Sequence, residues 1–320
     1  MPAFPKPTFD FTYDLQAEIA AQTNYRNTKP GRAIPAKAAN RLLLATWNIA
    51  NLGAQERRPK DYALMAEIIS WFDLVAVQEV KNDRKGLDQL LSALPQSWRT
   101  LYSDAAGNDE RMTFLYDSKK VKTRELVGEI AVAPSDLKNV KLPDTTVAKF
   151  DGFDRNHYTA SFEAGNTVFC LVNVHLYYGS ERAKPALERR ALEAYAVARW
   201  CERESKSKHS LTPIIAALGD FNLPKADPSD PIFKALTKTG LQLPKHSTQI
   251  GSNLAGDQHY DQVAFFPTGA GAKFTGEAGV FDFDGGVFAR LWNTKTPVQF
   301  RSYIRYHLSD HRPLWAQFEG

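Results

Sequence analysis

The chain of 320 residues contains only two cysteines, Cys170 and Cys201. Two cysteines are too few for a disulfide framework. Cys170 lies in the apolar run TVFCLVNV and Cys201 in a segment with helical spacing, so we expect both to be small core residues. This usage excludes the disulfide-rich secreted scaffolds and suits a reducing compartment such as the cytoplasm.

Long apolar runs and a leader-like N-terminus are also missing. No apolar stretch approaches the roughly 20 residues that span a bilayer. The first residues, MPAFPKPTFDFTYDLQAEIAAQ, lack the basic-then-apolar order of a signal peptide. With 43% apolar and 24% charged residues, the composition is that of an ordinary globular protein. We therefore expect a soluble protein, cytoplasmic or of unknown location, with no membrane partner, and the sequence indicates no obligate protein partner.

Several common catalytic motifs are absent as well. There is no HExxH or cysteine ligand set for zinc, no GxxxxGK[ST] or GxGxxG for nucleotides, and no GxSxG nucleophile elbow. The net charge of +4 allows an anionic partner but does not require one. We interpret the basic clusters as solvated faces: Arg57-Arg58-Lys60, Lys119-Lys120-Lys122 and Arg182-Lys184.

The apolar segments that are present predict an α/β domain. Residues 1–40 form an N-terminal extension with several prolines, and one domain is expected over residues 41–320. Short runs rich in β-branched and aromatic residues predict strands, and stripes with helical spacing, such as the one over residues 62–72, predict helices between them. The stretches of about 125–157 and 268–305 are expected to be long loops, which in compact domains are often functional.

Polar side chains recur where the predicted strands begin or end. Such positions can present side chains to a ligand without breaking the core of an α/β sheet. Taken singly, each has an ordinary structural explanation as a turn, a helix cap or a core histidine. Together they supply acids, amides and histidines at one kind of position. The residues are Asn48, Glu79, His175, Asp220, Asn222, Asp261, Asp310 and His311.

This combination of side chains is suited to metal-assisted phosphate chemistry. Carboxylate and amide oxygens are hard ligands that favour Mg²⁺, Mn²⁺ or Ca²⁺ over zinc. A histidine with an ordinary pKa near 6.5 can take a proton from water at neutral pH. In the segment IIAALGDFNLPK, an extended chain would point Asp220 and Asn222 the same way and turn Phe221 toward the core.

Six short motifs occur in a fixed order: TWNIANLG, VAVQEV, NVHL, GDFN, YDQV and SDHRP. This set resembles the endonuclease/exonuclease/phosphatase superfamily over about residues 41–320, and most of all the deoxyribonuclease I-like nucleases. The segments NDERMTFLYDSKKV and FDGFDRNHYTASF add to that likeness. The resemblance implies a four-layered α/β sandwich, in which two packed mixed β-sheets are flanked by helices and the active site lies between the sheets at one end.

The resemblance also implies a metal site. Glu79 would be the principal ligand, with Asn48 beside it, and Asp310 would complete the site. The expected ion is Mg²⁺, with Mn²⁺ or Ca²⁺ as possible substitutes.

A catalytic histidine pair is implied in the same way. His175 and His311 would be the pair, with Glu110 orienting His175 and Asp261 orienting His311. A paired carboxylate fixes the tautomer of the imidazole.

Four further residues are implied to act on the substrate. Asp220 and Asn222 would orient the scissile phosphate or hold a second ion, Arg155 would contact phosphate charge, and Lys81 would contact DNA. Two features of deoxyribonuclease I are missing: its disulfides and its DNA-stacking aromatic residue, near whose position Asn108 stands.

The sequence therefore predicts a divalent-metal-dependent phosphodiesterase that acts on nucleic acid, with DNA as the expected substrate and a deoxyribonuclease-like endonuclease as the expected activity. The alternative is a phosphoesterase of the same fold that acts on a small substrate of the inositol phosphate or sphingomyelin type. A third reading is a non-catalytic binding module. Its mark would be the loss of a catalytic group, whereas every expected group is present.

Overall fold

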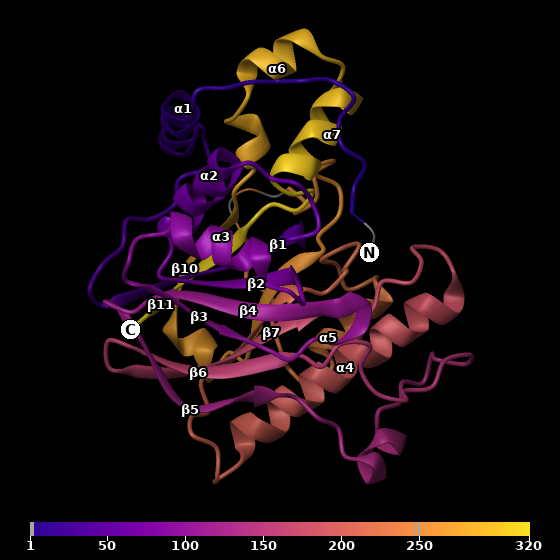
Figure 1. The fold of residues 1–320 in the computed structure, drawn as a ribbon. Helices are drawn as coiled ribbons and strands as arrows, with labels where there is room; N and C mark the ends of the chain where they lie inside the picture. The colour runs from indigo at the N-terminus through magenta and orange to yellow at the C-terminus, as the bar shows by residue number, and fades with distance from the viewer. Residues whose placement is uncertain (1–2, 247, 249) are drawn as a thin grey trace.

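Two β-sheets pack face to face in the computed structural model, and helices cover both outer faces (Figure 1). The structure describes residues 3–246, 248 and 250–320. The six-stranded sheet has the order β10 (Phe274–Val280), β11 (Leu314–Glu319), β1 (Arg41–Leu52), β2 (Leu74–Lys81), β4 (Glu110–Asp117) and β3 (Trp98–Tyr102). The five-stranded sheet has the order β5 (Val121–Glu129), β6 (Tyr158–Ala164), β7 (Thr167–His175), β8 (Ile215–Asp220) and β9 (Asp261–Phe265).

Both sheets are mixed, which confirms the predicted four-layered sandwich. Strand β1 pairs in parallel with β2 and antiparallel with β11. Strand β8 pairs in parallel with β7 and antiparallel with β9. The parallel pairs bring the carboxyl ends of β1, β2, β7 and β8 to one end of the sandwich, where loops can gather side chains.

Strand β1 shows why its sequence is a continuous apolar run. Leu42 and Leu44 face the second sheet, whereas Leu43, Ala45 and Trp47 face the helices. Successive side chains in a strand point to opposite faces, and here both faces are buried. At roughly 25 cal/mol per Å² of buried apolar surface, such two-sided burial stabilises the centre of the sandwich strongly.

Helices form the two outer layers. Helices α2, α3, α6 and α7 contribute to the apolar cluster on the outer face of the six-stranded sheet, and α4 and α5 pack on the five-stranded sheet (Figure 1). No helix within the described residues is both long enough and apolar enough to cross a membrane. The bounds are α1 (Leu15–Thr28), α2 (Pro59–Ser70), α3 (Lys85–Ala93), α4 (Lys184–Lys206), α5 (Pro231–Thr237), α6 (Ala289–Thr294) and α7 (Pro297–His307).

The N-terminal extension is attached by a buried polar cluster, which we call the N-terminal clamp: Tyr13, Arg58, Asp61 and His307. The Asp61 carboxylate accepts hydrogen bonds from the Tyr13 hydroxyl at 2.8 Å and from Arg58 Nη2 at 2.8 Å, and it lies 2.9 Å from His307 Nδ1. Phe11 packs beside the clamp, with its ring centroid 6.4 Å from that of Tyr13. The extension therefore lies against α2 and α7.

Two expectations about the chain were wrong. Residues 268–305 are not one long loop, because they contain β10, α6 and α7. The cluster Arg57-Arg58-Lys60 is not a solvated face, since Arg57 is only 8% exposed and Arg58 belongs to the N-terminal clamp. The other predicted long loop, about residues 125–157, overlaps the end of β5, and only its part from residue 130 to 157 lacks strands and α-helices.

Candidate active site

Three neighbouring strands place a row of polar side chains at one edge of the five-stranded sheet. His175 is the last residue of β7 and pairs in register with Asp220, the last residue of β8. Asp220 in turn pairs in register with Asp261, the first residue of the antiparallel strand β9. His175, Asp220 and Asp261, which the sequence places at strand ends, are therefore neighbours in the structure.

His311 joins this row from the other sheet, just before β11. Its Nδ1 lies 2.7 Å from Asp261 Oδ2, and its Nε2 lies 3.9 Å from Asp220 Oδ2. Burial alone would lower the pKa of His311, but the carboxylates of Asp261 and Asp220 raise it well above its usual value. Burial raises the pKa of Asp261 to about 6. Asp261 and His311 are therefore a closely paired carboxyl group and imidazole.

His175 has the opposite surroundings. Burial, followed by the positive charge of Arg155, lowers the pKa of His175 well below its usual value. Its Nε2 lies 3.7 Å from Asp220 Oδ2 and its Nδ1 lies 3.6 Å from Glu110 Oε2, so Glu110 is near but beyond hydrogen-bond distance. The two histidines thus flank the Asp220 carboxylate in unlike surroundings.

Asn48 and Glu79 form a second group next to this row. Asn48 Nδ2 donates to Glu79 Oε1 at 3.1 Å and to Asp220 Oδ2 at 2.9 Å. Asn51 donates its backbone N–H to Glu79 Oε2 at 2.8 Å. Ser309 fixes the backbone here, because its hydroxyl donates to the Asn48 carbonyl at 2.6 Å. The carboxylate of Glu79 is therefore held between the Asn48 side-chain amide and the Asn51 backbone N–H.

The chemistry of this group fits a hard divalent cation. Burial raises the pKa of Glu79, and the nearby carboxylates of Glu110 and Asp310 raise it further. Asn48 Oδ1 is buried and accepts no hydrogen bond from the described residues. Within that part of the chain no three His, Cys, Asp or Glu side chains form a ready-made metal cage. Mg²⁺ needs none, because it commonly takes one or two carboxylates, water and substrate phosphate.

Glu110, at the start of β4, is held by two cations. Its Oε1 lies 3.1 Å from Lys81 Nζ and its Oε2 lies 3.1 Å from Arg155 Nε. Arg155 also pairs with Asp154 at 3.3 Å. The structure therefore brings Lys81 and Arg155 to the site, but both are engaged by protein carboxylates, and only 15% of the Lys81 side chain is exposed.

The turn after β8 differs from the extended geometry expected from the sequence. Asn222 has a left-handed backbone with φ 47°, and its N–H donates to Asp220 Oδ1 at 2.8 Å. This is an Asx-turn, in which the side chain of an aspartate accepts a hydrogen bond from the backbone N–H of the second residue after it. Phe221 is fully buried, as expected. Asp220 and Asn222 still line one cavity, although the chain between them is bent.

That cavity has a volume of about 590 Å³ and contains most of the predicted site residues. Glu79, His175, Asp310 and His311 lie in its wall together with Asp220, Asn222 and Arg155. The sequence interpretation missed the aromatic part of the wall. The signal was present, because two aromatic residues and a glycine follow the histidine motif directly in HLYYGS. The aromatic residues are Phe4, Tyr177, Tyr178 and Tyr260.

Helix α4 supports this cavity from behind through two buried charged residues that the sequence interpretation also missed. Arg190 is fully buried and donates hydrogen bonds to the carbonyls of Tyr177, Tyr178, Ser180 and Asn222. This set joins the loop after β7 to the turn after β8, the two segments that follow His175 and Asp220.

Glu193, one helical turn after Arg190, holds two loops at once. Its carboxylate accepts the backbone N–H of Tyr177 at 2.9 Å and that of Asp154 at 3.1 Å. Burial raises the pKa of Glu193 to about 7. Because Asp154 precedes Arg155, this one carboxylate connects the loops on two sides of the cavity.

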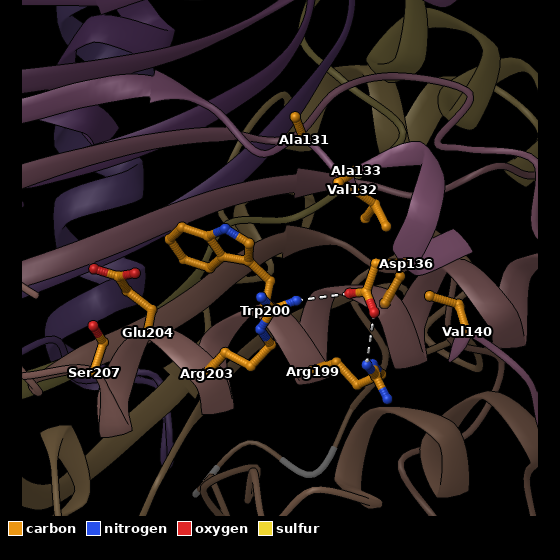
Figure 2. Close-up of a pocket in the computed structure, with 11 residues that line it drawn as sticks. Ala131, Val132, Ala133, Asp136, Val140, Arg199, Trp200, Arg203, Glu204 and Ser207 are labelled. Carbon is orange, nitrogen blue, oxygen red and sulfur yellow. Dashed lines mark hydrogen bonds and ion pairs between the residues drawn. The ribbon is translucent and has the colours of Figure 1, made fainter. Parts of the chain in front are cut away.

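A separate pocket of about 320 Å³ lies on the outer side of α4 (Figure 2). Asp136 forms an ion pair with Arg203 at 2.6 Å and another with Arg199 at 3.6 Å. Trp200 lies beside these groups in Figure 2. This pocket shares no residue with the cavity described above and contains no histidine, so it offers no comparable chemistry.

Comparison with known proteins gives one related sequence and several related folds. No protein-family model matches the chain. A deoxyribonuclease from Thioalkalivibrio sp. (strain K90mix) is 28% identical over 304 residues, which cover 90% of this chain and 73% of that protein.

Among solved structures, an endonuclease/exonuclease/phosphatase family protein from Bacteroides thetaiotaomicron matches with a TM-score of 0.56 and 15% identity, covering 87% of this chain and 94% of that one. A mannosyl-6-phosphatase from Bacteroides thetaiotaomicron VPI-5482 matches with a TM-score of 0.53 and 16% identity, covering 86% and 98%. At such identities a structural match establishes the fold alone. The chain thus has the fold of the endonuclease/exonuclease/phosphatase proteins, and its sequence is similar to that of a deoxyribonuclease.

Proposed function

We propose that this protein is a divalent-metal-dependent phosphodiesterase that hydrolyses nucleic acid, acting as a deoxyribonuclease-like endonuclease. One observation carries the proposal: two histidines, His175 and His311, flank the Asp220 carboxylate in the same cavity as the buried Glu79. The sequence similarity to a deoxyribonuclease supports the same reaction class.

Glu79 and Asn48, with Asp310 in the same cavity, are the residues that would hold Mg²⁺, or Mn²⁺ or Ca²⁺ in its place. When bound, such an ion neutralises phosphodiester oxygens and the charge that accumulates on them during attack. The carboxylates of Glu110 and Asp310 near Glu79, together with the unsatisfied Asn48 Oδ1, support this assignment.

The histidine pair would move the protons. In hydrolysis, a water oxygen forms a bond to phosphorus, the phosphorus–oxygen ester bond breaks, and the leaving oxygen takes up a proton. One imidazole accepts the proton of the water and the other supplies the proton of the leaving oxygen. The unlike surroundings of His175 and His311 suit such a division between base and acid. Asp261 acts as a positioning residue for His311.

Four residues would position the scissile phosphate between these groups, directly or through a neighbour. Asn222 donates its Nδ2 to the Leu176 carbonyl at 2.8 Å, which fixes its amide at the cavity wall. Asp220 accepts from Asn48 and lies near both histidines, so it orients them relative to the metal site. Arg155 supplies positive charge toward the phosphate, and Lys81 would act beside it through Glu110.

The alternative is a phosphoesterase acting on a small phosphorylated molecule, of the inositol phosphate or sphingomyelin type. Two observations favour it: a mannosyl-6-phosphatase shares the fold, and a cavity of about 590 Å³ is large enough for a small ligand.

The test is a substrate panel with purified protein. Supercoiled plasmid, RNA, inositol hexakisphosphate, mannose 6-phosphate and sphingomyelin are each incubated with Mg²⁺, Mn²⁺ or chelator. We expect metal-dependent nicking of the plasmid, lost in His175→Ala and retained in His209→Ala, whose histidine is exposed and outside the cavity. Release of inorganic phosphate from a monoester, with the plasmid intact, would refute the nuclease and support the alternative.

A further inference from the structure

Four aromatic side chains share the cavity with the polar groups: Phe4, Tyr177, Tyr178 and Tyr260. Each is half-buried, so each contributes ring surface to the wall. We propose, resting on the proposed function, that these rings stack on unpaired bases beside the scissile phosphate, so that the protein cleaves single-stranded nucleic acid in preference to duplex. Aromatic stacking contributes roughly 1–3 kcal/mol per base in single-strand binding and tolerates any base sequence.

The ring of Tyr177 is fixed before any substrate arrives. The Arg189 guanidinium lies 4.1 Å from its centroid. Gly179, with φ 62°, lies directly against the ring, because a Cβ at Gly179 would be 2.3 Å from Tyr177 Cε1. The carboxylate of Glu193 accepts a hydrogen bond from the backbone N–H of Tyr177. A ring held in this way loses little conformational entropy when a base stacks on it.

Tyr178 and Tyr260 are fixed as well. The Tyr260 hydroxyl donates to Glu181 Oε1 at 2.9 Å, and its ring centroid lies 5.7 Å from that of His311 with an interplanar angle of 33°. The Arg190 guanidinium lies 5.2 Å from the centroid of Tyr178. A flat aromatic surface therefore begins next to a catalytic histidine, where a base adjoining the scissile phosphate would lie.

The distribution of basic residues argues against a duplex. Duplex binding depends on rows of lysine and arginine that neutralise phosphates on both strands. Apart from the two histidines, Arg155 is the one basic side chain among the described residues that line the cavity, and it is already paired with Glu110 and Asp154. Elsewhere, Arg57 is buried, and Lys120 pairs with Asp73 at 3.2 Å.

The experiment compares three substrates of equal length under Mg²⁺: a single-stranded oligonucleotide, the same sequence as a duplex, and a single strand with abasic residues around one labelled phosphodiester. We expect kcat/KM for the intact single strand to exceed those for the other two by about 10-fold or more, which matches the lower part of the stacking range.

Two variants refine the test. Tyr178→Ala should lower kcat/KM for the intact single strand and leave that for the abasic strand nearly unchanged. Tyr102→Ala, which removes a tyrosine outside the cavity that is 39% exposed, should change neither. Equal cleavage of intact and abasic strands, or preferred cleavage of the duplex, would overturn the stacking proposal while the nuclease function stands. Cleavage of none of the three would overturn the nuclease function and this inference together.

Discussion

Gly219, in the GDFN motif, is a glycine because the two central strands of the second sheet approach too closely for a side chain. Its φ is 147°, and a Cβ there would lie 2.0 Å from the Val174 carbonyl oxygen. Neither the Gly219 backbone nor the Val174 carbonyl can move away without shifting β8 against β7. The same approach places His175 and Asp220 opposite each other, so this glycine serves the site as well as the sheet.

The substitution Gly219→Ala should therefore destabilise the protein by about 3 kcal/mol or more, because backbone would clash with Cβ at a φ that disfavours a side chain. Chemical denaturation gives the free energy of unfolding. Gly128→Ala is the control, since no atom lies within 4 Å of a Cβ there and its φ is not in the left-handed region. Equal stability of the two variants would contradict the account of this strand pair.

Asp261 is buried and contacts His311 at 2.7 Å, so its charge determines the tautomer and orientation of that imidazole. Asp261→Asn should keep the fold and lower the rate of phosphodiester cleavage by about 10²-fold or more, the usual contribution of acid–base catalysis. The measurement is initial rate at saturating Mg²⁺ together with a thermal unfolding curve. Asp151→Asn, at an exposed position, should leave the rate unchanged. A fully active Asp261→Asn protein would show that His311 needs no carboxylate partner.

At the scale of elements, α4 connects the sheet to the loops of the site. Glu193 is buried, and its pKa of about 7 lies above the ordinary value of 4.5 because of that burial. The folded protein then holds a proton more tightly than the unfolded chain. This carboxyl contributes stability that is fully present below about pH 4.5 and is lost as the pH rises through about 7.

Glu193→Gln removes this titration and keeps the shape of the side chain. Between pH 4.5 and 7 we expect the wild-type free energy of unfolding to fall relative to that of the variant, by up to about 3 kcal/mol. Urea denaturation at four pH values measures the difference. Parallel profiles for the two proteins would show that Glu193 does not titrate in this range.

The elements that sequence reasoning predicted are those with strong apolar patterns. Strands β1, β7 and β8 are buried on both faces, and their apolar runs predicted them. Strands β5 and β10 are edge strands of the two sheets, with mixed exposure and glycines, so their patterns were too weak to read. Helix α7 was missed because its region was interpreted as a loop.

In the site, too, the sequence pattern predicted which residues lie together but not how their side chains pair. Strand-end positions predicted which acids, amides and histidines lie together, because parallel strands share one carboxyl edge. Pairing within the site could not be predicted from positions along the chain. Glu110 binds Lys81 and Arg155 rather than His175, and Asn222 turns back on Asp220, because side chains compete for the nearest partner of opposite charge or hydrogen-bonding character.

At the scale of the whole molecule, the N-terminal extension runs over the helical layer and reaches the cavity. Phe4 lines the cavity, and the N-terminal clamp holds the chain nine residues later at Tyr13. Asp61 is the centre of the clamp. Burial alone would raise the pKa of Asp61, but His307 and Arg58 hold it well below its usual value. The clamp is therefore organised around one buried carboxylate.

Asp61→Asn should destabilise the protein by about 3 kcal/mol or more, because Arg58 and His307 lose a buried charged partner. Tyr13→Phe is the matched variant, which removes one hydrogen bond to the same carboxylate and should cost about 1–2 kcal/mol. Denaturation midpoints and limited proteolysis of residues 3–14 measure both effects. If the two variants were equally stable, the clamp would owe its strength to packing rather than to the charge of Asp61.

We propose that the cavity around Glu79 binds a divalent cation and cleaves phosphodiesters with it. The most direct measurement is the rate of plasmid nicking as a function of Mg²⁺ concentration for the wild type and Glu79→Gln. We predict no nicking in chelator, saturation with Mg²⁺ for the wild type, and a rate at least about 10²-fold lower for a folded Glu79→Gln protein. Nicking that persists in chelator, or a Glu79→Gln protein with the wild-type Mg²⁺ dependence, would contradict the claim.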